Sequence, residues 1–164
     1  MAWPNGYGTS RSDYESDLLP AMIDAGIKYA RAPESNNFNL PEDWYRWSST
    51  CHHNSAPLFA EKFVALENSG DLKCFFNWGH TYEFEQNEGN DSKDWTMIEN
   101  VMKTLQPDNI WFATNGDIYR YVEATKLVEV TDTTVTNNSD MTVYYNINGT
   151  NVELAPGEVY SVVD

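Results

Sequence analysis

Positive charge is scarce in this sequence. Ten lysine and arginine residues stand against twenty-five aspartate and glutamate residues in a chain of 164, which gives a net charge of −15. A chain this acidic repels phosphate backbones and anionic lipid headgroups. We therefore expect no nucleic acid and no membrane among its partners, and a neutral or cationic ligand fits the charge better.

Cysteine and long apolar runs are also scarce. Cys51 and Cys74 are too few for a disulfide framework and form no C-x-x-C pair, so we expect two buried free thiols. No apolar run is long enough to span a bilayer, and the first six residues lack the basic and apolar regions of a signal peptide. As written, the chain is expected to be cytoplasmic, or extracellular if it is a processed fragment of a longer protein.

What the sequence does contain, up to about residue 125, is an alternation of strand-like and helix-length patterns, which is typical of parallel sheet with crossover helices. Gly26 is placed to end the first helix, and residues 33–55 read as a long structured loop. The expected helices cover residues 13–25, 57–66, 94–105 and 116–125, and the expected strands cover 27–31, 72–78 and 109–114.

The pattern of residues changes after Lys126. Runs rich in β-branched and aromatic residues are separated by turn signals, of which Asn148-Gly149 is the strongest hairpin signal. We predict two parts, an α/β domain over 1–125 and a small antiparallel β appendage of about three strands over 126–164.

Five short segments suggest a family. The order and spacing of these segments resemble the later motifs of polysaccharide deacetylases, which are carbohydrate esterases that remove acetyl groups with a divalent metal. The segments are Ala2-Trp3-Pro4-Asn5-Gly6, residues 25–31, Leu40-Pro41-Glu42-Asp43-Trp44, residues 76–84 and residues 110–117. The resemblance implies a partial (β/α) barrel of the polysaccharide-deacetylase type.

The resemblance also implies roles for single residues. His80, at the end of a predicted parallel strand, resembles the general acid that protonates the leaving group. Asn5 occupies the position whose backbone N–H forms the oxyanion hole, where the family usually has an aromatic residue. Asp43 resembles a carboxylate that orients an arginine, Trp44 the apolar wall beside the leaving group, and Arg31 is the candidate ion-pair partner.

The metal-binding motifs of that family lie upstream of the part that this chain resembles, and the chain contains neither of them. Either another part of a longer protein supplies them, or other ligands replace them, or the chain does not catalyse. His52 and His53 are adjacent, and on a regular strand they point to opposite faces, although a loop relaxes that restriction. We favour hydrogen-bonded loop histidines beside a cleft, and keep a metal site that includes His80 as the alternative, with zinc as the first choice of ion.

Aromatic side chains supply the expected sugar-binding surface, since flat rings suit the apolar faces of sugars. Trp3, Trp44, Trp78 and Tyr82, with Arg31, fall in the segments expected to face the cleft. Two further tryptophans, Trp95 and Trp111, are assigned to the core because they lie on periodic apolar faces. The acidic run from Glu83 to Asp94 is interpreted as a solvated loop, although its oxygen atoms would permit weak calcium binding.

The sequence therefore predicts hydrolysis of acetyl groups on a carbohydrate, with His80 as the acid. The alternative from another class is a non-catalytic carbohydrate-binding or scaffolding piece. An esterase with a different nucleophile ranks last, because no G-x-S-x-G motif is present. Because a barrel without its first strands exposes an open sheet edge, we also expect a homo-oligomer in which each chain covers the edge of another.

Overall fold

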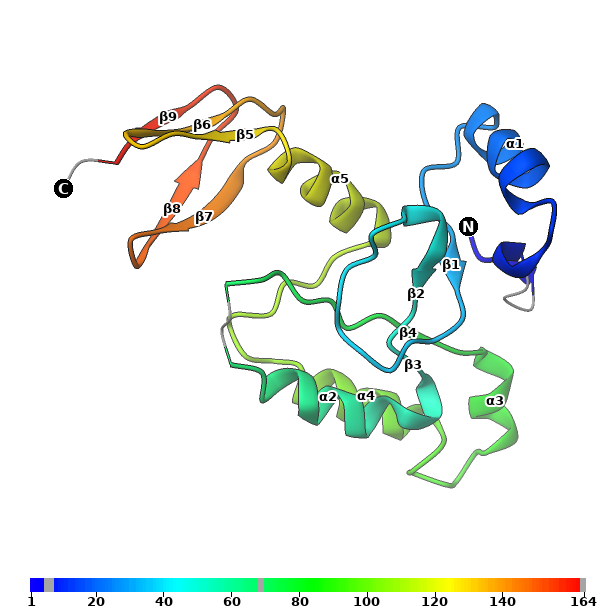
Figure 1. The fold of residues 1–164 in the computed structure, drawn as a ribbon. Helices are drawn as coiled ribbons and strands as arrows, with labels where there is room; N and C mark the ends of the chain where they lie inside the picture. The colour runs from blue at the N-terminus through cyan, green and yellow to red at the C-terminus, as the bar shows by residue number, and fades with distance from the viewer. Residues whose placement is uncertain (5–7, 68–69, 163–164) are drawn as a thin grey trace. The chain divides into compact units, whose positions relative to one another are not determined.

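The computed structural model describes residues 1–4, 8–67 and 70–162, and the chain divides into two compact units, Met1–Trp111 and Phe112–Asp164 (Figure 1). The boundary falls earlier than the division at residue 125 expected from the sequence. Helix α5 (Asn115–Thr125) belongs to the second unit because Tyr121 and Ala124 pack in its apolar core.

The first unit begins with a short 3-10 turn, Gly8–Ser10, and a helix in two parts. A π-helical turn, Tyr14–Leu18, runs into α1 (Leu19–Asp24), and Gly26 follows at φ 75°, which is the left-handed conformation expected at a helix end. This agrees with the predicted helix and its stop. Trp3, Tyr14, Met22 and Ala30 form the buried core beneath it.

Two pairs of very short parallel strands form the sheet structure of this unit. Strand β1 (Arg31–Ala32) pairs with β2 (Trp47–Ser48), and β3 (Cys51–His52) pairs with β4 (Asn77–Trp78). In the second pair His52 lies opposite Trp78. Among the described residues the sheets are small and none closes into a barrel, so the partial barrel stays a prediction.

Helices carry most of the remaining structure of the first unit. Helix α2 (Ala56–Val64) packs on α4 (Trp95–Thr104) through Ala60 and Val101, and Asp94 caps α4 by accepting a hydrogen bond from the Thr96 N–H. Short 3-10 turns precede β2 and α2, and a helix that the sequence did not predict follows β4. These are η4 (Trp44–Arg46), η5 (His53–Ser55) and α3 (Thr81–Gln86). No helix in the described part of the chain is long and apolar enough to cross a bilayer.

Three strand predictions are wrong in extent or existence. Of residues 72–78 only Asn77–Trp78 are in a strand, residues 109–114 form none, and the strand expected at 27–31 is β1, Arg31–Ala32. Core positions for Trp95 and Trp111 are also wrong, because their exposed fractions are 49% and 54%. Trp95 lies on a helix as predicted, but the side chains of both tryptophans face solvent.

The second unit is an antiparallel β structure preceded by α5. Thr114 and Asp117 form a reciprocal capping box at the start of α5. The predicted Asn148-Gly149 turn is confirmed, with φ values of 50° and 83°, and it joins two paired strands. In its described residues the appendage has five strands rather than about three. Strands β5 (Val128–Val130), β6 (Thr134–Asn137) and β9 (Val159–Ser161) form one sheet, and β7 (Val143–Ile147) and β8 (Thr150–Leu154) form another.

Both cysteines are buried free thiols, as predicted. Burial raises the pKa of the Cys74 thiol to about 11 and also raises the pKa of Cys51. We expect iodoacetamide at pH 8 to alkylate Cys74 at least ~100-fold more slowly in the folded chain than in urea, because the thiolate is the reactive form. Mass spectrometry over time measures this, and rapid labelling of the folded chain would contradict the buried position.

Candidate functional site

An open cleft of about 570 Å³ lies where β4 ends and α3 begins. Its lining includes Trp78, Gly79 and His80 from this junction, Arg31 from β1 and His53 from η5. The sequence predicts a site at the end of the strand that carries Trp78. The cleft lies at that position.

Three short elements bring the three histidines together. His52 ends β3 and His53 starts η5 directly after it, whereas His80 is the residue before α3. Because the chain leaves the strand between His52 and His53, their rings do not point to opposite faces, and the ring centroids are 4.0 Å apart. The restriction expected for a regular strand therefore does not apply here.

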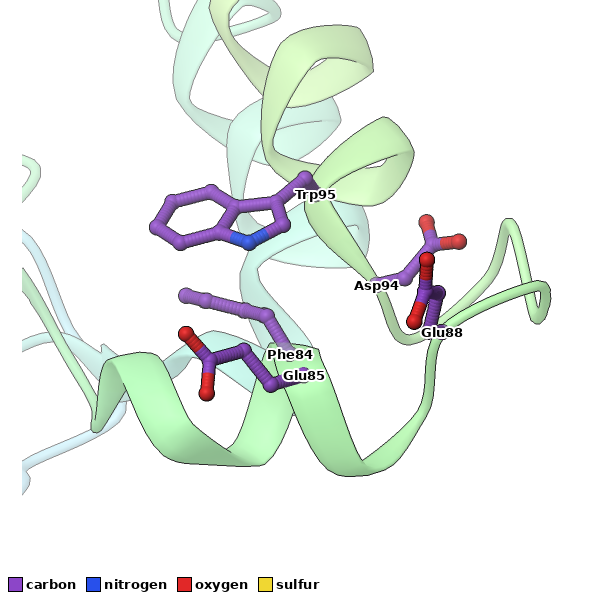
Figure 2. Close-up of a pocket in the computed structure, with 5 residues that line it drawn as sticks. All are labelled: Phe84, Glu85, Glu88, Asp94 and Trp95. Carbon is purple, nitrogen blue, oxygen red and sulfur yellow. The ribbon is translucent and has the colours of Figure 1, made fainter.

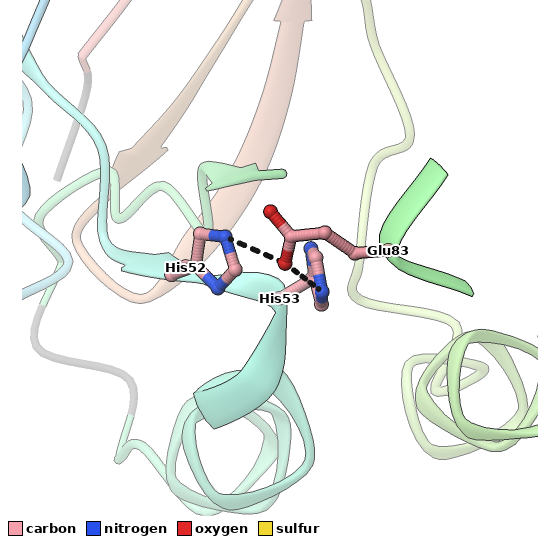
Figure 3. Close-up of side chains that lie close together, drawn as sticks. All are labelled: His52, His53 and Glu83. Atoms are coloured by element: carbon pink, nitrogen blue, oxygen red, sulfur yellow. Dashed lines mark ion pairs between the residues drawn. The ribbon is translucent and has the colours of Figure 1, made fainter. Parts of the chain in front are cut away.

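Glu83, in the first turn of α3, contacts all three histidines. Its Oε1 lies 2.8 Å from His80 Nδ1, and its Oε2 lies 3.1 Å from His53 Nε2 and 3.5 Å from His52 Nε2 (Figure 3). The two oxygens thus serve different partners. One holds His80 at the rim of the cleft, and the other faces the pair from β3 and η5.

The carboxyl group of Glu83 is ionised at neutral pH. Its pKa is lowered, chiefly by the hydrogen bond with His80. An ionised carboxylate only accepts hydrogen bonds, so His80 Nδ1 must be the donor. Glu83 therefore fixes the His80 tautomer and leaves Nε2 as the second functional atom of the ring.

His53 is the most deeply buried of the three histidines. Its side chain is 1% exposed, and burial, followed by the charge of His52, lowers its pKa, so the ring is neutral. Neither ring nitrogen has a hydrogen-bond partner, which means that the 3.1 Å approach of Nε2 to Glu83 is not aligned as a hydrogen bond. A buried nitrogen without a partner costs free energy, and a ligand that fills its valence would recover that cost.

The donor set fits a divalent ion of the zinc type. Single donor atoms of His52, His53 and Glu83 all lie within 4.8 Å of one another. Ligands about 2.0–2.1 Å from a tetrahedral zinc ion are separated by about 3.3 Å, and the two distances to Glu83 Oε2, 3.1 and 3.5 Å, lie on either side of that value. Neutral imidazole with carboxylate is the kind of donor set that zinc prefers.

The aromatic side chains expected to bind sugar are only partly at the cleft. The Trp78 ring contacts His52 at 4.7 Å between centroids, and the guanidinium of Arg31 lies 4.5 Å from its face. Tyr82 is 53% exposed and its ring centroid is 5.1 Å from that of His80. These three side chains keep a candidate role in ligand binding.

Other predicted site residues lie elsewhere. Trp3 is buried in the N-terminal core, where its indole N–H donates to the Tyr45 carbonyl, so its ring is not available in the cleft. Trp44 is half-buried against Trp47, with ring centroids 5.1 Å apart. The candidate oxyanion-hole residue, Asn5, lies outside the described residues.

The predicted pairing of Asp43 with Arg31 does not form. Asp43 caps the turn η4 by accepting from the Tyr45 N–H, and its carboxylate lies 3.5 Å from Arg46. Arg31 stacks on Trp78 instead. Asp43 finds its partners within its own segment and acts as a structural cap, whereas Arg31 contacts a residue of strand β4.

Glu83 is a candidate site residue that the sequence does not single out. As part of an acidic run it is expected to be solvated, and its contacts with His52 and His53 are not visible in the sequence because they join segments far apart in the chain. The signal that was present is local, since His80 and Glu83 are three residues apart at a helix start and so face each other.

Three further acidic residues of this run border a smaller pocket of about 210 Å³ (Figure 2). Phe84 and Trp95 form an aromatic pair with ring centroids 4.7 Å apart, and Glu85, Glu88 and Asp94 surround it. Asp94 already caps α4. This pocket therefore has a structural explanation in the packing of α3 on α4.

Comparisons with known proteins add no assignment. No family model, no curated protein and no solved structure matches this chain. Any functional conclusion therefore depends on the chemistry of the cleft and on the motif resemblance.

Proposed function

We propose that the cleft hydrolyses acetyl groups on a carbohydrate, with His80 as the proton donor to the leaving group. The observation that carries this proposal is the 2.8 Å contact between His80 Nδ1 and Glu83 Oε1 at the cleft, where the His80 side chain is 48% exposed. A histidine that is oriented by a carboxylate through one nitrogen and reaches substrate with the other is a common general acid. The motif resemblance to polysaccharide deacetylases gives the substrate class.

The chain's own groups have separate tasks in this reaction. Glu83 holds the His80 ring, and the doubly protonated ring gives its Nε2 proton to the departing sugar oxygen or nitrogen. Trp78 and Tyr82 offer ring faces for the sugar, and Arg31 offers hydrogen-bond donors beside Trp78. A divalent ion, when bound, would lower the pKa of water and polarise the acetyl carbonyl.

Replacing His80 with alanine tests this role. We expect the rate of acetate release from an acetylated chito-oligosaccharide to fall about 100-fold, since general acid catalysis contributes at least that factor. Glu83→Gln should also lower the rate, because an amide can present its NH₂ group to Nδ1 and the ring then loses its fixed tautomer. The exposed Glu99→Gln variant on α4 is the matched control and should keep the wild-type rate.

A second candidate function is carbohydrate binding without turnover, which the rings of Trp78 and Tyr82 favour. Calorimetry with the same oligosaccharide separates the two functions. Binding without acetate release in the presence of added zinc supports the second function and contradicts the first. Turnover that is unchanged in His80→Ala would show that His80 is not the proton donor.

A further inference from the structure

We propose that His52, His53 and Glu83 bind one divalent transition-metal ion, with Nε2 of each histidine and Oε2 of the glutamate as ligands. This site differs from the upstream motifs to which the resemblance assigns metal binding, and it does not depend on the hydrolytic function. Three protein ligands leave a fourth tetrahedral position open, as in catalytic rather than structural zinc sites.

His53 provides the strongest argument for a bound ion. Its ring is 1% exposed, and its Nε2 faces Glu83 Oε2 at 3.1 Å without the alignment of a hydrogen bond. Two nitrogens of a buried ring rarely stay without partners. An ion between Nε2 and Oε2 would use the nitrogen lone pair and give this nitrogen the partner that it lacks.

His52 is expected to be the weaker histidine ligand. Its Nδ1 accepts a hydrogen bond of 3.4 Å from the Asn54 N–H, which places the ring proton on Nε2 in the metal-free chain. Binding through Nε2 moves that proton to Nδ1 and breaks this long hydrogen bond. The ring is also more exposed, at 20%, so metal binding to its nitrogen gains less free energy than at His53.

Glu83 would then connect the ion with His80. Oε2 binds the ion while Oε1 keeps the hydrogen bond of 2.8 Å from His80 Nδ1. A carboxylate that ligates with one oxygen and accepts a hydrogen bond with the other is a recurring arrangement around metal ions. His80 is thus a positioned neighbour of the ion through Glu83 and not a ligand.

Metal binding to the full chain tests this ligand set. The chain is stripped with chelator, the zinc dissociation constant is measured by competition with a chromophoric chelator, and Co²⁺ replaces zinc for visible absorption. We expect one ion per chain, a cobalt spectrum of tetrahedral type, and a loss of affinity of more than about 100-fold in Glu83→Gln and His53→Ala. For His52→Ala we expect a smaller loss, about 10-fold to 100-fold.

His80→Ala is the matched control, because it removes an imidazole from the same cleft without removing a ligand. Its zinc affinity should stay within about 10-fold of the wild-type value. This is the smallest loss expected when a side chain that hydrogen-bonds to a metal ligand is removed. If His53→Ala fails to fold, Glu83→Gln and His52→Ala still decide the question.

The proposal is overturned if the wild-type chain binds no zinc at micromolar concentration, or if Glu83→Gln and His52→Ala bind zinc as the wild type does. It is also overturned if His80→Ala loses as much zinc affinity as Glu83→Gln. Stoichiometric zinc without acetate release would remove the proposed function and leave the metal site intact.

Discussion

Replacing Gly79 with alanine is expected to lower the free energy of unfolding of the first unit by about 3 kcal/mol, at the upper end of the range for overpacked sites. A Cβ atom at position 79 would lie 1.8 Å from His53 Nδ1 and 2.8 Å from its Cγ. The ring is buried and cannot turn into solvent. The added methyl group must therefore displace His53 or separate β3 from β4, and either change also moves Nε2 away from Glu83.

Tryptophan fluorescence in a urea titration measures this cost selectively. All six tryptophans lie at or before Trp111, so their signal reports on the first unit alone. The double variant His53→Ala with Gly79→Ala supplies the control, since the methyl group then enters the space left by the imidazole. We expect the cost of Gly79→Ala to fall below about 1 kcal/mol in that background. An equal cost in both backgrounds would show that the close approach to His53 is not the cause.

The Asn137→Asp substitution is expected to destabilise the second unit by about 3–5 kcal/mol. Asn137 is fully buried, and its amide nitrogen donates to the carbonyl groups of Met141, Leu154 and Ala155 at 2.8, 2.9 and 3.1 Å. Its Oδ1 accepts from the Ser139 N–H and hydroxyl. A carboxylate keeps the acceptor but places a negative charge against three carbonyl oxygens that have lost their donor.

Hydrogen exchange measured by mass spectrometry follows this effect strand by strand. Faster exchange is expected throughout β5 to β9, while the tryptophan fluorescence transition of the first unit serves as an internal reference. Asn138→Asp is the matched control, because it adds the same charge at the next, exposed position. If both variants accelerate exchange equally, net charge rather than the buried hydrogen-bond network is responsible.

Sequence reasoning succeeded where a local pattern determines the structure. Helices α2 and α4 follow from apolar side chains at helical spacing, and the Asn148-Gly149 turn follows from the residues that tolerate positive φ. Apolar runs were less informative about strands. The run at 72–78 indicates burial, but strand structure also needs a partner, and only Asn77 and Trp78 find one in β3.

The candidate site shows the same division. His80 was identified because it follows a strand-like run, and the cleft lies at that position. The pairing of His52 and His53 through Glu83 was not predictable, because it needs the turn between β3 and η5 and the placement of an unpredicted helix. Trp3 shows the converse error, since an aromatic residue in a candidate motif was taken for a ligand contact and instead fills the core.

Helix α3 is the element that links these observations. It has six residues, too few for a helix that is stable by itself, and its one buried side chain is Phe84, which packs between His53 and Trp95. Segments with so little buried apolar contact open locally at a fraction of the global unfolding free energy. On warming, Glu83 would therefore move away from the histidines while α2 and α4 are still folded. The packing of the Phe84 ring, rather than the global unfolding transition, would then set the highest temperature at which the site stays assembled.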